Sequence, residues 1–214
     1  MKRNLFCLFL GLFACMAYSQ EINATLYGGY TFNDSFDSYY DRNNYYEGTI
    51  DGGLQWGLGL EYMLHPNSGI ELLYLRQDTH SPTTYLTNSF GGIQRTNFEL
   101  DLNYFMLGGT AHFPSANAPI EGFAGAMVGF VAAKLTNPDN GNTNNGTKFS
   151  WGLKAGAILW ASETVGLKLQ AQLLSAVQAV GGGFYFGGYG PQVGISSYST
   201  FYQFTLGGGP VFKF

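Results

Sequence analysis

Apolar and polar residues alternate one by one in segment after segment of this chain, and this alternation restricts the possible folds more than any other feature. The clearest run sets Leu54, Trp56, Leu58, Leu60, Tyr62 and Leu64 against Gln55, Gly57, Gly59 and Glu61. A period of two is typical of a β-strand, in which neighbouring side chains point to opposite faces of the sheet. The sequence therefore predicts strands that each have one apolar and one polar face.

Eight segments carry this alternation, and the connections between them alternate in length. The segments lie near 22–32, 54–64, 69–77, 98–106, 120–135, 149–159, 165–173 and 202–214. The short connections are 65–68, 114–119 and 161–164, and the long ones are 33–49, 78–95, 136–148 and 176–199. A tilted strand crosses a bilayer in about 9–11 residues. Short turns on one side and long loops on the other are typical of membrane barrels. We therefore predict an all-β fold, an eight-stranded antiparallel up-and-down transmembrane β-barrel.

The composition agrees with a barrel and excludes two other classes. Charged residues make up 11% of the chain, against roughly 25% in an ordinary soluble domain. This is too few to cover the surface of a soluble protein of this size. Mean hydropathy is -0.02, and no run of about 18 apolar residues follows the N-terminal segment, so membrane-spanning helices are not expected. A barrel in which every second residue is apolar satisfies both observations.

The same alternation would also suit a soluble barrel, so the direction of the apolar face must be argued separately. The polar face has few charges and many small or amide side chains, which suits a narrow interior better than a water-facing surface. Aromatic residues gather near the predicted strand ends, as they do at membrane interfaces. These residues are Tyr30, Phe32, Tyr62, Phe98, Phe149, Trp151, Trp160, Tyr202, Phe212 and Phe214. We therefore expect the apolar face to point outward on the alternating strands, including Leu100 to Met106 on the fourth. The fifth segment is apolar and small on both faces, so the sequence does not orient it.

The N-terminus has the pattern of a secretory signal peptide. Lys2 and Arg3 precede a short apolar stretch, and Ala17-Tyr18-Ser19 offers small residues for cleavage before Gln20. We expect a signal peptide over 1–19 and one barrel domain over 20–214. The alternative is a lipoprotein cleaved before Cys15.

Export would leave a chain without cysteine, because Cys7 and Cys15 both lie in the expected signal peptide. Disulfides and thiolate metal sites are then excluded from the mature chain. Loss of Lys2 and Arg3 lowers the basic count from 10 to 8 against 14 acidic residues. A balance of about -6 argues against nucleic acid as a partner.

The chain stops on an aromatic residue at the end of the last predicted strand. Gly209, Phe212 and Phe214 resemble the C-terminal signal that the barrel-assembly machinery reads. With the strand pattern, they make the mature chain similar to the OmpA/OmpX-like small barrels of the Gram-negative outer membrane, often described as porin-like. This resemblance implies a location among lipid and lipopolysaccharide, and it implies fold more than activity.

Inward-pointing charges should meet inside the barrel, because eight strands enclose a space that their own side chains fill. Strand parity places four acidic and three basic residues inside: Glu61, Glu71, Glu99, Asp101, Lys154, Lys168 and Lys213. Counting from the turns predicts two ion-pair layers. One holds Glu61, Glu71, Lys168 and Lys213 near the short turns, and the other holds Glu99, Asp101 and Lys154 farther out. The alternative is that some of them reach water at the mouth.

Few residues suggest chemistry. Asp78, His80 and Ser81 lie together where the third strand leaves the bilayer, but nothing else indicates a catalytic set, so we expect a polar loop and no enzyme. His65 and His112 lack ligand spacing, so neither a metal nor another cofactor is expected.

Three binding surfaces remain possible. Arg76 and Arg95 flank the second long loop and suit lipopolysaccharide phosphates. Aromatic loops, with Tyr39, Tyr40, Tyr45 and Tyr46 in the first and 181–191 in the fourth, suit a protein or glycan partner.

The leading hypothesis is a structural or interaction role, such as envelope integrity, adhesion or membership of a larger complex. The alternative is a narrow pore for small or apolar solutes, with a lateral opening at the fifth strand as one route, and an enzyme acting on lipid or peptide comes third.

Overall fold

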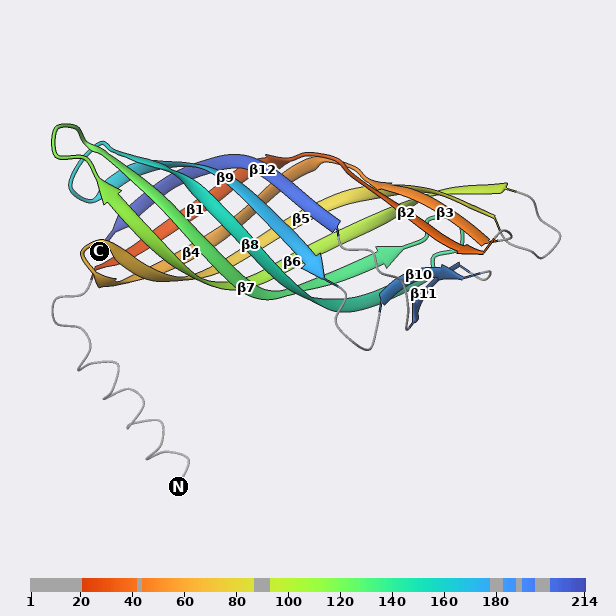
Figure 1. Ribbon diagram of the computed structural model, residues 1–214. Coiled ribbons are helices and arrows are strands. Elements are labelled where there is room, and N and C mark those ends of the chain that lie inside the picture. The colour runs from red at the N-terminus through yellow and green to blue at the C-terminus, as the bar shows by residue number, and fades with distance from the viewer. Residues whose placement is uncertain (1–20, 42–43, 87–92, 178–182, 188–189, 195–200) are drawn as a thin grey trace, which may run out of the picture.

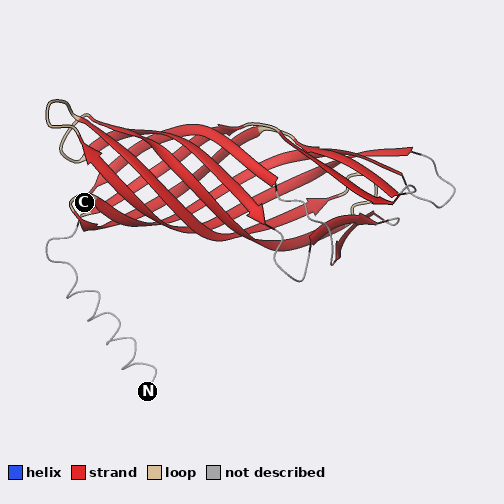
Figure 2. Cartoon of the chain, in the orientation of Figure 1, coloured by secondary structure: helices blue, strands red, loops and turns tan. Residues whose placement is uncertain are grey.

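The computed structural model describes residues 21–41, 44–86, 93–177, 183–187, 190–194 and 201–214, and these residues form strands and turns (Figures 1 and 2). The expected signal peptide, Cys15 and the cleavage point before Gln20 lie outside them. No helix in this described part of the chain is long and apolar enough to cross a membrane.

Eight antiparallel strands close into a barrel, as the sequence predicts. They are β1 (Ile22–Thr31), β4 (Gly53–His65), β5 (Ser68–Leu86), β6 (Ile93–Pro114), β7 (Ile120–Thr136), β8 (Thr143–Trp160), β9 (Val165–Val177) and β12 (Phe201–Lys213). Each of these strands pairs with the next one in this order, and β12 pairs with β1 to close the barrel. The ends meet where Ile22 N donates to Phe214 O at 3.1 Å and Phe214 N donates to Ile22 O at 2.9 Å. A closed barrel leaves no open edge in its membrane-facing part.

The predicted long loops contain more strand than expected. The first holds the hairpin of β2 (Asp34–Asp41) and β3 (Asn44–Ile50), and β3 pairs with the far end of β5. The fourth holds the short hairpin of β10 (Gly183–Gly187) and β11 (Gly190–Gly194).

The interpretation of 78–95 as a loop is wrong, because β5 runs on to Leu86 and pairs with β6 from Ile93. In the third connection, β8 likewise begins at Thr143. These polar stretches contain many threonines, whose β-branched side chains suit strands once a partner strand is present.

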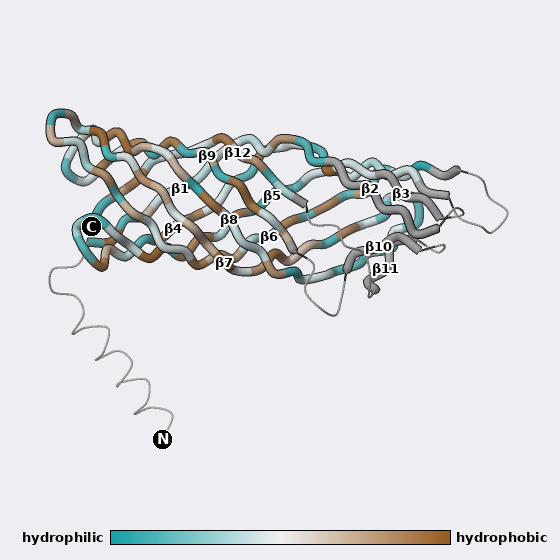
Figure 3. Tube along the Cα trace, viewed as in Figure 1, coloured by the Kyte–Doolittle hydropathy of each residue, from teal (hydrophilic) through white to brown (hydrophobic). Residues whose placement is uncertain are grey.

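Apolar side chains cover the outside of the barrel body, and many of the residues in this part of the tube are hydrophobic, drawn brown in Figure 3. Exposed members include Leu26, Leu54, Leu58, Leu60, Leu72, Leu107, Val128, Leu153, Leu167, Leu169 and Leu206. Toward the long-loop end this belt finishes in a row of adjacent rings, Trp56, Tyr74, Phe105 and Phe130, whose centroids lie 5.1–6.1 Å from their neighbours. We call this row the girdle. An apolar belt that ends in aromatic rings suits a bilayer and its interface.

Beyond the girdle the outer face changes character. Arg76, Asp78 and His80 point outward on β5, and Glu99 and Lys134 do so on β6 and β7. The extensions of β5, β6, β7 and β8 beyond the girdle, with β2 and β3, are called the projecting strands below. On β5, β6 and β7 this polar outer face is typical of a protein surface in water.

The predicted direction of the fourth alternating segment is wrong. Phe98, Leu100, Leu102, Tyr104 and Met106 on β6 are buried inside, and Phe98 is therefore not an interface aromatic. Most of this segment lies beyond the girdle. Water replaces lipid outside the barrel there, so the apolar face turns inward as it does in a soluble protein. The five side chains join a buried apolar cluster with residues of β5 and β7.

Candidate functional site

The charged groups inside the barrel gather near its short-turn end. Glu61 on β4 and Glu71 on β5 are both 2% exposed and pair directly across the two strands. Lys154 on β8 reaches over the lumen and forms an ion pair with Glu71. Lys168 on β9 lies 3.9 Å from Glu61 Oε2 and 3.7 Å from Glu71 Oε1. Two adjacent carboxylates would repel each other, and the two ammonium groups from the opposite wall offset this repulsion.

A histidine extends the set toward the short-turn opening. The His112 ring on β6 is 1% exposed, and its Nε2 lies 2.9 Å from Glu61 Oε1. Its Nδ1 bonds to Glu121 on β7, which is partly exposed. Glu121 also accepts a hydrogen bond of 2.9 Å from Trp160 Nε1. His112 therefore bridges a buried carboxylate and one near the opening.

These six residues, Glu61, Glu71, His112, Glu121, Lys154 and Lys168, form the lumen cluster. With His112 protonated, three positive groups face three carboxylates, so the cluster has no net charge. A buried ionised group costs several kcal/mol unless charge and hydrogen bonds compensate it. Neutrality of the whole cluster is what lets six ionisable groups occupy so narrow an interior.

Aromatic side chains complete the surroundings. Tyr27 OH donates to Glu71 Oε1 at 2.7 Å. Lys168 Nζ lies 4.5 Å from the centroid of the Phe123 ring and 5.6 Å from that of Tyr27, which adds cation–π attraction where the ammonium lacks a close carboxylate. Charged and aromatic groups therefore contact each other at this level of the lumen.

Glycine makes room for this arrangement. A Cβ at Gly59 would lie 2.7 Å from Cε2 of Tyr27 and 2.9 Å from Oε1 of Glu71. A larger side chain at this position would therefore have to displace the Tyr27 ring or the Glu71 carboxylate. The alternation at 54–64 therefore carries a packing requirement as well as a strand signal.

The structure places the seven charges expected inside in different positions. Glu61, Glu71, Lys154 and Lys168 lie together in the lumen. Glu99 and Asp101 point outward, so the prediction of a second, higher layer is wrong, and Lys154 belongs to the cluster near the short turns instead. Lys213 is partly exposed at the barrel end, where its Nζ lies 2.7 Å from Glu21 Oε2.

Two members of the lumen cluster, His112 and Glu121, were missed. The parity of β6 carries the signal for His112, because residues 104, 106, 108, 110 and 112 share one face of that strand. Once Tyr104 is placed inside, His112 follows. Glu121 is the second residue of β7, whose two faces are both small and apolar, so its direction has no signal in the sequence.

The other candidate residues are dispersed. His80 points outward and Ser81 points inward, while Asp78 Oδ1 accepts a hydrogen bond of 3.0 Å from Arg76 Nε. Asp78, His80 and Ser81 therefore do not converge on one site. Arg95 is exposed on β6.

The remaining predictions concern metal binding and the aromatic loops. His65 is exposed at a turn, and no group of three or more His, Asp or Glu side chains in the described part could hold a metal ion. The side chains of the tyrosines at 39, 40, 45 and 46 lie outside what the structure describes, as do those of 181–191.

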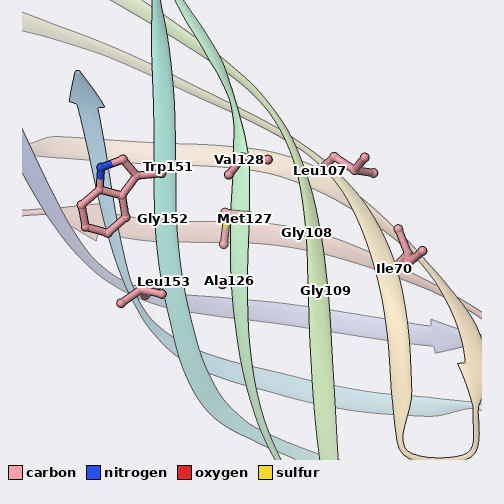
Figure 4. A pocket seen from close by; sticks show the side chains of 10 residues that line it. All are labelled: Ile70, Leu107, Gly108, Gly109, Ala126, Met127, Val128, Trp151, Gly152 and Leu153. Carbon is pink, nitrogen blue, oxygen red and sulfur yellow. The ribbon is translucent and has the colours of Figure 1, made fainter. Parts of the chain in front are cut away.

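The outer wall has an apolar groove of about 520 Å³ across β5, β6, β7 and β8 (Figure 4). Its lining residues are Ile70, Leu107, Gly108, Gly109, Ala126, Met127, Val128, Trp151, Gly152 and Leu153. None of them is polar apart from the indole nitrogen of Trp151. The groove therefore belongs to the apolar belt.

Comparison with known proteins identifies the family. The family model described as outer membrane protein beta-barrel domain matches residues 5–177. No curated protein sequence gives a significant match.

Several solved structures share the fold. Neisserial surface protein A has a TM-score of 0.54 and 13% identity, covering 91% of this chain and 97% of its own. OprG of Pseudomonas aeruginosa has 0.52 and 11%, covering 91% and 95%. The outer membrane protease OmpT of Escherichia coli has 0.51 and 9%, covering 91% and 96%. At these identities the likeness concerns the fold alone.

One conclusion follows from the apolar belt on the outside of the barrel, the closed eight-stranded sheet and the family match. The chain belongs to the outer membrane protein beta-barrel domain family, and its barrel lies in an outer membrane.

Proposed function

We propose that this protein is a closed barrel whose membrane-embedded body anchors the projecting strands, and that these strands act in a structural or interaction role at the cell surface. Such a role includes envelope integrity, adhesion or membership of a larger outer-membrane complex. The observation that carries the proposal is the polar outer face of β5, β6 and β7 beyond the girdle, with Glu99, Asp101 and Lys134 among its residues. A protein or glycan partner would meet this face first.

The lumen cluster supports the closed state. Lys154 crosses the interior to Glu71, and His112 links Glu61 to Glu121. A pore of ion-conducting width would require these pairs to separate. The competing function, a narrow pore for small or apolar solutes, therefore predicts a different result in planar-bilayer recording. We expect no steady current from the unmodified protein, whereas a stable, large conductance would contradict the proposal.

Site-specific cross-linking tests the interaction role, because the expected mature chain has no cysteine of its own. Glu99→Cys places a thiol on the outer face of the projecting strands, and Leu107→Cys places one in the apolar belt on the same strand. A cross-linker with one water-accessible thiol-reactive arm and one photoreactive arm should join position 99 to a protein or glycan in intact cells. Equal or absent labelling at the two positions would count against a surface partner.

We propose a lipid contact just beyond the girdle. Arg76 lies two residues beyond Tyr74 of the girdle, and Arg95 is exposed farther out. Guanidinium groups bind phosphate oxygens in pairs, so lipopolysaccharide phosphates are the proposed ligand. Arg76 already has Asp78 as a partner, with Nη2 and Oδ1 2.8 Å apart. Loss of co-purifying lipopolysaccharide in Arg76→Gln, but not in Lys213→Gln, is the expected outcome.

Assembly is proposed to depend on the C-terminal residues. The backbone of Phe214 is hydrogen-bonded to that of Ile22, while the Phe214 side chain is 77% exposed and accessible to a binding partner. We propose that Gly209, Phe212 and Phe214 are read by the barrel-assembly machinery and that residues 1–19 are removed on export. Pulse-labelled Phe214→Ala protein should enter the outer membrane more slowly.

An enzymatic role is the least supported alternative, although one structure of similar fold is a protease. His80 would be the candidate base. Unchanged lipid A profiles and protease assays in His80→Ala would dismiss it.

A further inference from the structure

Four glutamine side chains occupy the lumen next to the lumen cluster, on its side away from the short turns. Gln55, Gln77, Gln172 and Gln203 come from β4, β5, β9 and β12 and are 3% exposed or less. Such amides are rarely buried, because each has two donor hydrogens and an acceptor oxygen to satisfy. We call this set the glutamine layer.

Contacts link the layer across the barrel. Gln55 and Gln77 pair directly on adjacent strands and both point inward. Gln172 Nε2 lies 3.5 Å from Gln55 Oε1 on the opposite wall. Gln203 Oε1 accepts a hydrogen bond of 2.6 Å from Tyr104 OH, and Gln203 lies two residues from Thr205, the strand partner of Gln172.

Several amide atoms in the layer have no partner in the protein. They are Nε2 of Gln55, Nε2 of Gln203, and both Nε2 and Oε1 of Gln77. Buried polar side-chain atoms are nearly always hydrogen-bonded to protein or ordered water, because leaving one unsatisfied costs free energy. The layer therefore offers both donors and an acceptor to a further molecule.

The side chains next to Gln77 and Gln203 leave these atoms without a hydrogen bond. On β5 the buried Leu73 and Leu75 lie between Gln77 and Glu71. Across the sheet, Leu102 pairs with Gln77 on β5 and β6, and Leu174 pairs with Gln203 on β9 and β12. A molecule that bonds here must be small and must both donate and accept hydrogen bonds.

We propose that the glutamine layer is a binding site for ordered water, in the lumen on the side of the lumen cluster that faces the long loops. Water fits because it has two donors and two acceptors and occupies the smallest volume of any such molecule. Buried waters commonly make about three hydrogen bonds to protein groups. Bridging waters would join Gln77 to Gln55 and Gln203 and would make the lumen hydrated at this depth without making it conducting.

Solid-state NMR of the protein in phospholipid bilayers tests the proposal directly. Magnetisation transferred from water should reach the side-chain amide of Gln77, as it reaches the exposed amide of Asn97, while the belt indole of Trp151 serves as the lipid-facing control. The Gln77 amide should exchange with deuterium more slowly than Asn97, because the lumen cluster closes one side. Transfer to Asn97 without transfer to Gln77 would show a dry layer and overturn the proposal.

A variant gives a second, independent reading. Gln77→Met keeps the length of the side chain and removes both unpaired atoms. If the layer is dry, this change removes an unsatisfied amide and raises the urea midpoint of unfolding. If the layer holds water, the change removes its bridging partner, so the midpoint falls and the water signal at Gln203 weakens. Leu102→Met, at the paired position, controls for the new methionine. A raised midpoint in Gln77→Met with no shift in the control contradicts the proposal.

Discussion

Removal of one charge from the lumen cluster should destabilise the barrel far more than removal of a charge at its rim. Lys154→Met leaves Glu71 without its closest cation and gives the cluster a net negative charge. Breaking a buried ion pair by removing one partner typically costs about 3–5 kcal/mol, and we expect a loss of this size in the free energy of unfolding. Glu71 keeps the Tyr27 hydroxyl as a donor, but a neutral donor compensates a buried carboxylate only in part.

The matched control is Lys213→Met. Lys213 also pairs with a carboxylate, Glu21, at 2.7 Å, but its side chain is 33% exposed and that of Glu21 is 52% exposed. Exposed ion pairs contribute about 0–1 kcal/mol, so this variant should unfold at nearly the wild-type urea concentration. The two lysines therefore separate burial from charge.

Restoring neutrality should recover much of the loss. In the double variant Lys154→Met with Glu71→Gln, the remaining Glu61, Glu121, Lys168 and His112 balance again. Residues in direct contact show coupling of about 0.5–3 kcal/mol in double-mutant cycles, and we expect a value in the upper half of this range.

The measurement is reversible urea unfolding in phospholipid vesicles, followed by the fluorescence of the three tryptophans. Equal losses in Lys154→Met and Lys213→Met would refute the reasoning, as would a double variant whose loss equals the sum of the single ones. Either result would mean that water at this depth screens the charges.

Two further predictions follow from the packing and from the inverted strand face. Gly59→Ala should cost about 1–3 kcal/mol by pressing on the lumen cluster, whereas Gly28→Ala, where a Cβ meets nothing within 4 Å, should be neutral or stabilising by up to about 1 kcal/mol. Phe98→Glu buries an unpaired carboxylate and should cost several kcal/mol or prevent folding, while Glu99→Leu should fold normally; a barrel that folds with Phe98→Glu but not with Glu99→Leu would restore the outward assignment.

The sequence predicted the number and pairing of the barrel strands because alternation and connection length are local signals. Each strand needs only its own residues to reveal a period of two. The polar ends of β5 and β6 escaped prediction because their strand character depends on pairing with each other, from Asp78↔Asp101 to Leu86↔Ile93. Pairing between distant segments is a property of the fold and has no local period.

Residue direction was predictable on the clearly alternating strand segments that lipid surrounds, and not where water surrounds the barrel. Glu61, Glu71, Lys154 and Lys168 all lie on strand segments within the apolar belt, and parity placed each of them inside. Partner choice was not predictable, because it depends on which inward side chains meet at one depth after the strands tilt. Lys154 illustrates this, since it was expected in a higher layer and reaches Glu71 instead.

The error on β6 follows from its length. A strand that only crosses a bilayer needs about 9–11 residues, whereas β6 has 22, so about half of it stands in water. An alternating strand has one apolar face, and removing that face from contact with water is favourable. It points outward among acyl chains and inward where water surrounds the barrel. On β6 the exposed Phe105 and Leu107 in the belt and the exposed Glu99 beyond it share one face of the strand. The change from apolar to charged along a single face, at Asn103, therefore marks the membrane boundary in the sequence itself, and long alternating strands should be examined for such a change before any direction is assigned.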